Sequence, residues 1–103
     1  MKRRRVRIHP DLLADVIEAL DYYRQIDHTL ATRFLNSYTS GLRHIQVHPL
    51  ASPEFVPGFR RLVLVPFPYL VAFAVDDESV LVAALLHTHR DPRTNQNVLK
   101  RRS

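Results

Sequence analysis

The spacing of apolar residues changes near the middle of this chain of 103 residues, from a helical period to a strand-like one. Over residues 11–26, apolar side chains recur every three or four positions, at Leu13, Val16, Ile17, Leu20 and Tyr23. This spacing places them on one face of an amphipathic helix. From residue 59 onward, apolar and β-branched residues instead form short runs between turn signals, which is typical of strands.

A second helical pattern follows the first after a very short connection. Asp27 is a suitable N-terminal cap, and the apolar stripe that follows consists of Leu30, Phe34, Leu35, Tyr38, Leu42 and Ile45. This helix must end before Pro49, because a proline disfavours helical geometry in the residue before it. Two helices joined so tightly predict an antiparallel hairpin.

Four runs of the chain predict strands. Val6 and Ile8 alternate with charged residues, which indicates a short N-terminal strand. Three further strands are expected over residues 59–65, 69–75 and 80–87, with a Pro-Phe-Pro turn and a polar turn between them. Residues 49–58 contain three prolines and a glycine, so we expect a loop there. The predicted fold class is α+β, with an N-terminal strand and an antiparallel helical hairpin packed on a three- to four-stranded antiparallel sheet.

Length and composition exclude several kinds of protein. A chain of this size forms one domain, which we place at residues 1–92, followed by a basic tail over 93–103 that is either a short helix or disordered. Cysteine is absent, which excludes disulfide scaffolds and thiol catalysis. Gly41 and Gly58 stand alone, which excludes glycine-rich phosphate loops. The longest apolar run, residues 62–75, is shorter than the roughly 20 residues that cross a bilayer, so we expect a soluble, cytoplasmic protein with no membrane partner.

The net charge of +5 is concentrated at the two ends of the chain. Basic residues gather at the N-terminus (Lys2, Arg3, Arg4, Arg5, Arg7) and at the C-terminus (Arg90, Arg93, Lys100, Arg101, Arg102). Acidic residues gather between them, at Asp11, Asp15, Glu18, Asp21 and Asp27. This distribution favours a polyanion or an acidic protein as partner, with mere solubility as the alternative.

The last predicted strand ends in the residues best suited to chemistry. His87 and His89 are two positions apart, so on a strand they would face the same way, and Arg90 follows them. We expect the start of the strand over residues 59–65 and the end of the strand over residues 80–87 to lie toward one sheet edge. This would gather Arg60 or Arg61 with the two histidines. The alternative is one packed histidine, one exposed histidine and solvated arginines.

Metal and cofactor chemistry has little support in the sequence. His44 and His48 are four residues apart on a predicted helix and could share a metal, but no third ligand lies nearby. We therefore expect no metal and no cofactor.

Seven segments follow one another in a characteristic order. They are an arginine-led strand, a Pro-Phe-Pro-Tyr turn, a final strand that ends in His-Thr-His-Arg-Asp-Pro, and four earlier pieces. In this chain they are Phe59-Arg60-Arg61-Leu62, residues 66–73, residues 80–92, Ile8-His9-Pro10, Tyr22-Tyr23, Arg33-Phe34-Leu35 and His48-Pro49. Taken together, these segments resemble the ParE/RelE superfamily of type II toxin–antitoxin toxins.

The resemblance implies a toxin that a cognate antitoxin neutralises in a hetero-oligomer. ParE-like members of the superfamily poison DNA gyrase, whereas RelE-like members cleave mRNA on the ribosome with basic residues and often a late tyrosine. Here Leu70 stands where an active nuclease often has arginine, and no tyrosine follows Tyr69. A ParE-like gyrase inhibitor is therefore expected, and Arg60, Arg61, Tyr69, His87, Arg90 and Arg93 are the residues expected to bind the target or partner.

Two alternative functions remain open. One is a RelE-like, ribosome-dependent mRNA endonuclease, with Arg60, Arg61, His87, His89 and Arg90 as its catalytic residues. The other is a non-toxic nucleic-acid-binding module. The sequence leaves open whether the protein is an enzyme.

Overall fold

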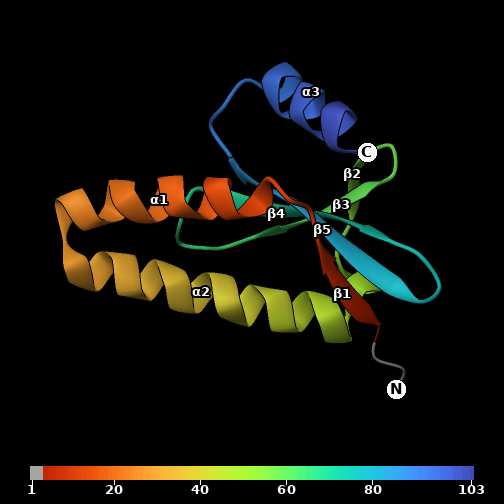
Figure 1. The fold of residues 1–103 in the computed structure, drawn as a ribbon, viewed down its shortest axis with the longest axis horizontal. Coiled ribbons are helices and arrows are strands. Elements are labelled where there is room, and N and C mark those ends of the chain that lie inside the picture. Colours follow the sequence, from red (N-terminus) through yellow and green to blue (C-terminus); the bar gives the residue numbers. More distant parts are fainter. Residues whose placement is uncertain (1–3) are drawn as a thin grey trace.

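The computed structural model describes residues 4–103, so Lys2 and Arg3 of the basic N-terminus lie outside the described residues (Figure 1). In chain order the elements are β1 (Arg5–Ile8), α1 (Leu12–Ile26), α2 (His28–Val47), a 3-10 helix (Pro49–Ala51), β2 (Glu54–Val56), β3 (Phe59–Val63), β4 (Tyr69–Val75), β5 (Ser79–His87) and α3 (Pro92–Arg102). The strands form one sheet in the order β1-β5-β4-β3-β2. The predicted α+β class and the helical hairpin are confirmed.

Within residues 4–103 the sheet has five strands and is mixed, which differs from the expected three or four antiparallel strands. β1 pairs with β5 in parallel, because the long connection between them, which contains α1, α2 and β2 to β4, returns the chain in the same direction. β2 forms within residues 49–58, where we expected a loop. A Pro57-Gly58 turn makes this strand possible, since Gly58 has φ +83, and the chain folds back to pair Val56 with Phe59.

The helical hairpin turns where its capping residue predicts. α1 begins after Asp11, which occupies the N-cap position without a side-chain hydrogen bond to the first turn. Asp27 alone connects the helices, and its Oδ1 accepts the Thr29 N–H at 2.8 Å. Further along α2, a Cβ added to Gly41 would lie 2.8 Å from Leu64 Cδ2, so glycine allows the helix to approach the sheet closely.

Two layers of helix cover opposite faces of the sheet (Figure 1). The hairpin face is the side covered by α1 and α2, and its largest side chains are Tyr23, Phe34, Phe67, Phe73 and Ile45. The α3 face is the opposite side, and its buried residues are Phe59, Leu70, Ala72, Ala83, Ala84, Leu86 and Leu99. The alternation of strand side chains divides the apolar residues between these two cores.

The C-terminal residues form a helix, one of the two outcomes expected for them. Asp91 caps α3 through its Oδ1, which accepts the Arg93 N–H at 2.9 Å, and Pro92 occupies the first turn. Leu99 is only 1% exposed and anchors the helix on the sheet. Among residues 4–103, no helix has both the length and the apolar character that crossing a membrane requires.

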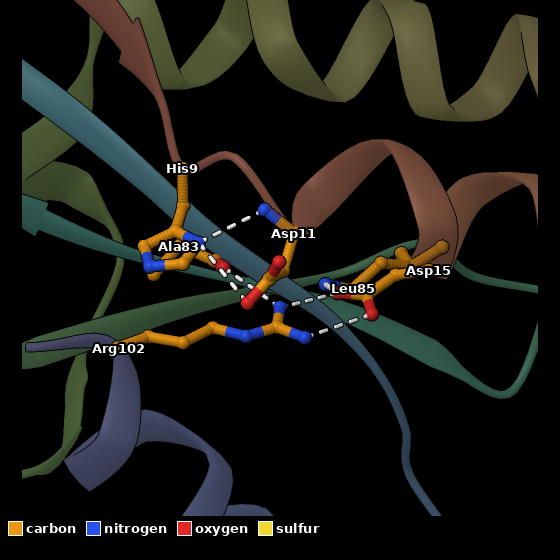
Figure 2. A network of polar contacts seen from close by, with 6 residues as sticks. All are labelled: His9, Asp11, Asp15, Ala83, Leu85 and Arg102. Atoms are coloured by element: carbon orange, nitrogen blue, oxygen red, sulfur yellow. Dashed lines mark hydrogen bonds and ion pairs between the residues drawn. The ribbon is translucent and has the colours of Figure 1, made fainter.

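A partly buried ion pair ties α3 to α1 where β1 ends (Figure 2). Arg102 donates to Asp15 Oδ2 at 2.6 Å, to Asp15 Oδ1 at 3.1 Å and to the Ala83 carbonyl at 3.0 Å. Asp15 Oδ2 also accepts the Leu85 N–H at 3.1 Å. The hydrogen bond to Asp15 is the main reason that the pKa of Arg102 is raised. β1 pairs with β5 only as far as Val82. Beyond it, Asp15 and Arg102 provide the hydrogen-bond partners for backbone groups on the edge of β5.

Candidate functional site

Tyr69 and His87 form the centre of the candidate site, at the end of the sheet where β4 begins and β5 ends. They are direct cross-strand partners, and their ring centroids lie 5.1 Å apart in an edge-to-face arrangement. Tyr69 also contacts the aromatic core, with centroid distances of 6.2 Å to Tyr23 and 5.4 Å to Phe34. The core therefore fixes the Tyr69 ring from behind, and Tyr69 in turn positions the imidazole of His87.

The two histidines are adjacent, as the sequence predicts, but a turn rather than a strand brings them together. Their ring centroids are 5.4 Å apart, and His87 Nδ1 accepts the His89 backbone N–H at 3.1 Å. The proton of the neutral His87 ring consequently lies on Nε2, which leaves a hydrogen-bond donor for a partner. His87 is partly buried and His89 is exposed.

The surroundings of Tyr69 do not suit its phenol to act as a base. Burial raises its pKa, the negative charge of Glu18 and the neighbouring Tyr22 raise it further, and the positive charge of Arg90 opposes them. The phenol therefore keeps its proton at neutral pH. Arg90 is close enough for its charge to act on Tyr69, so it belongs to the same cluster.

Arg90 also lines a cavity of about 420 Å³ on the α3 face, together with Arg61. The guanidinium carbon of Arg61 lies 5.6 Å from the centroid of the Phe55 ring, which is a cation–π distance. Neither arginine takes part in an ion pair within residues 4–103. The structure therefore brings Arg61 and Arg90 to one cavity, with both charges available to a ligand.

Arg60 and Arg93 lie apart from this group. Arg60 points to the opposite side of β3 from Arg61, as expected for neighbours on a strand, and its Nη1 donates to the Ser52 carbonyl at 2.7 Å. This bond holds the segment before β2 against β3, which is a structural role. Arg93 is exposed in the first turn of α3 and makes no ion pair within the described part of the chain.

The expectation that the start of β3 and the end of β5 share one end of the sheet is wrong. Each antiparallel step reverses direction, so two steps make β3 and β5 run the same way, and the start of β3 is level with the middle of β5. Arg61 is level with Ala84 through β4, which is roughly 10 Å along the strand from His87. The five residues considered for a nuclease are consequently divided between the two faces.

This arrangement suits recognition better than covalent chemistry. His87 and Tyr69 present two donors on the hairpin face, whereas Arg61 presents its charge on the α3 face, with Arg90 between them. Transition-state stabilisation needs such groups to converge on one atom. Residues 4–103 contain no group of three His, Cys, Asp or Glu side chains placed to bind a metal.

Sequence reasoning missed two residues beside the site. Phe55, from the unexpected strand β2, places Arg61, and Asn95 of α3 lines the same cavity. Asn95 Nδ2 donates to the His87 carbonyl at 3.2 Å, which fixes the amide orientation, and its Oδ1 is buried without a partner among residues 4–103. A polar residue on the apolar side of a short helix was the only available signal.

Known proteins resemble this chain over most of its length. The model of the family described as "ParE toxin of type II toxin-antitoxin system, parDE" matches residues 6–92. Toxin ParE2 of Mycobacterium tuberculosis, in two strains, is 29% identical over 90 residues, which cover 86% of this chain and 86% of that protein. A solved structure described as the chromosomal ParDE TA system from P. aeruginosa has a TM-score of 0.74 at 18% identity, and covers 84% of this chain and 98% of that chain. At this identity, the structural likeness concerns the fold.

Proposed function

The chain belongs to the ParE toxin family of type II toxin–antitoxin systems, and from this premise we propose that it inhibits DNA gyrase and is neutralised by a cognate antitoxin. The observation that carries the choice of gyrase is the place of Leu70. It is 4% exposed and packs in the core of the α3 face. A buried apolar side chain thus occupies the position where an active nuclease of the superfamily often has arginine.

Arg60 and Tyr69 also argue against RNA cleavage. In the transition state of cleavage, the phosphodiester carries extra negative charge. Removing one of the hydrogen-bond donors that stabilise this charge costs about 3 kcal/mol. Here Arg60 is engaged by the Ser52 carbonyl and the Tyr69 phenol keeps its proton, so neither supplies a free charge or a base. This favours inhibition by binding over inhibition by cleavage.

The surface that we propose for gyrase consists of Tyr69, His87 and Arg90. Tyr69 is held by the aromatic core, and His87 is held by Tyr69 and by the His89 N–H, so the first two side chains are ordered before a partner arrives. Preorganised aromatic and arginine side chains contribute strongly to protein interfaces, because little entropy is lost on binding.

The antitoxin is proposed from the charge of the toxin and from the family. The net charge of +5 favours an acidic partner, and β2 is an edge strand to which another chain can add. Co-expression with the product of the adjacent reading frame is expected to restore growth and to yield a stable complex on purification. Recovery of the toxin alone, with growth still arrested, would refute this part of the proposal.

Pulse labelling after tightly controlled induction tests the target. Thymidine incorporation is expected to fall before methionine incorporation, and purified gyrase is expected to accumulate cleaved plasmid when the toxin is added. The combined His87→Ala, His89→Ala and Arg90→Ala variant should lose both effects, whereas Arg33→Ala, an exposed arginine on α2, should keep them. An earlier fall in methionine incorporation would instead indicate the ribosome and mRNA as target.

A further inference from the structure

A groove runs between α3 and the β2–β3 hairpin, and of the proposed gyrase surface only Arg90 also lines it. Two cavities of about 420 Å³ and 270 Å³ form it, and Val56 and Gln96 line both of them, so the cavities adjoin. We call this pair of cavities the α3 groove. Its two ends differ in chemistry, and this difference indicates what it binds.

One end of the α3 groove is basic. Arg61 and Arg90 line the larger cavity, and Phe55 holds the guanidinium of Arg61 at 5.6 Å from its ring centroid. Glu54 lines the same cavity, so the local charge there is one net positive unit, and it has no ion pair with either arginine in the described chain. Two unpaired guanidinium groups form a site for a carboxylate or another oxyanion.

The other end is apolar. The smaller cavity is lined by Pro57, Phe59 and Leu99, with Lys100 beside them. Phe59 and Leu99 are 6% and 1% exposed, so the core fixes these walls. A concave apolar wall of this kind accepts a single apolar side chain from a partner.

The boundary of the basic end also contains an unsatisfied acceptor. Asn95 lines the larger cavity, and its Oδ1 is buried without a hydrogen-bond partner in residues 4–103, although its Nδ2 is satisfied by the His87 carbonyl. An unpaired buried acceptor costs stability. An occupant that brings an N–H group, directly or through a trapped water, would remove that cost, and a peptide backbone carries such donors.

We propose that the α3 groove binds an extended acidic–apolar segment of the antitoxin. A carboxylate of the segment lies between Arg61 and Arg90, and a neighbouring apolar side chain packs against Phe59 and Leu99. The inference rests on the proposed function only for the identity of the partner.

A nucleic acid fits the groove less well than a peptide. Each nucleotide carries a phosphate, whereas basic side chains dominate only one end of the groove. The Phe55 ring, which could stack a base, already faces Arg61.

The test uses a fluorescein-labelled, terminally blocked peptide of sequence Glu-Glu-Ser-Leu-Ser-Leu, and a control peptide with lysine in place of glutamate. Binding is measured to the wild-type toxin, to an Arg61→Gln and Arg90→Gln variant, and to an Arg33→Gln and Arg43→Gln variant. The last variant loses the same charge from exposed positions on α2. The purified antitoxin is titrated against the same three proteins.

We expect the acidic peptide and the antitoxin each to bind the groove variant at least tenfold more weakly than the other two proteins. The peptide should shift the amide resonances of Val56, Thr88 and Gln96, and the lysine peptide should not bind. Equal weakening in both variants, resonance shifts on another surface, or stronger binding of a labelled single-stranded oligonucleotide would overturn the inference. Failure of the wild-type toxin to bind the antitoxin would refute the proposed function. The peptide measurement then decides whether the α3 groove binds an acidic–apolar segment.

Discussion

The two faces of the sheet differ in the size of the side chains that they bury. On the hairpin face, large aromatic rings pack together, with Phe34 5.3 Å from Phe67 and 5.4 Å from Tyr69 between centroids. On the α3 face, three alanines lie in the sheet under one short helix. Burial of apolar surface stabilises in proportion to area, so the hairpin face contributes most of the stability. The α3 face is less completely filled, and the α3 groove lies on that side.

α3 depends on its contacts more than the long helices do. It has 11 residues, compared with 15 in α1 and 20 in α2, and isolated helices of this length are marginal in water. Leu99 and Arg102 supply its main contacts with the rest of the molecule. Substitutions on the two faces should therefore have different effects. A substitution on the hairpin face should destabilise the whole fold, whereas one on the α3 face should release α3 locally.

The largest effect is expected from Phe34→Ala on the hairpin face. Phe34 is fully buried and contacts three other aromatic rings, so its removal leaves a cavity and should cost about 4 kcal/mol. Denaturant unfolding followed by circular dichroism measures this loss. Leu35→Ala is the matched control, since its side chain is 41% exposed on the same helix and should cost under about 1 kcal/mol. Similar losses in both variants would contradict the importance given to the aromatic core.

Leu99→Ala should produce a smaller and local effect on the α3 face. The expected loss is about 2 kcal/mol, at the lower limit for buried leucine, because a terminal helix can detach instead of enclosing a cavity. Hydrogen exchange should accelerate in α3 while the amides of α1 and α2 keep their protection. Uniform acceleration through all three helices would show that the two faces unfold together.

Asp15→Asn tests the ion pair that joins the two layers. Asparagine keeps an oxygen for the Leu85 N–H but removes the charge that pairs with Arg102, and we expect a loss of about 1.5 kcal/mol. The control is Asp21→Asn, which breaks an exposed pair with Arg24 and should cost under about 0.5 kcal/mol. If the two variants lose equal stability in thermal unfolding, the pair of Asp15 with Arg102 does not hold α3.

The helices and central strands could be predicted because their apolar spacing is local information. The helix ends followed from Asp27 and Pro49, and the strands followed from runs of β-branched and aromatic residues. β2 could not be predicted in this way, because three residues are too few for a period, and its pairing depends on the turn at Gly58. The parallel pairing of β1 with β5 is likewise a property of the whole topology.

The candidate site was predicted in part, and the errors have a geometrical cause. His87 and His89 lie together because they are neighbours in sequence, whereas placing Arg60 or Arg61 beside them needed the direction of three strands. The pairing of Asp15 with Arg102 joins residues 87 positions apart, and no local sequence pattern predicts it. Asn95 is visible only once α3 is seated on the sheet.

The smallest expected effect concerns Asp76, in the turn that joins the central strands β4 and β5. Its pKa lies below the ordinary value of 3.8, mainly because its carboxylate accepts the Glu78 and Ser79 backbone N–H groups, at 2.9 and 2.6 Å. A lowered folded pKa means that the carboxylate stabilises the fold above pH 3.8, and that this contribution is lost as the pH falls through the folded pKa. Asp76→Asn should thus lower the midpoint of thermal unfolding at pH 7 and match the wild type more closely near pH 2. Because the turn belongs to neither face, hydrogen exchange should rise equally on both. A rise in hydrogen exchange confined to α3 would show that the turn supports the α3 face more than the hairpin face.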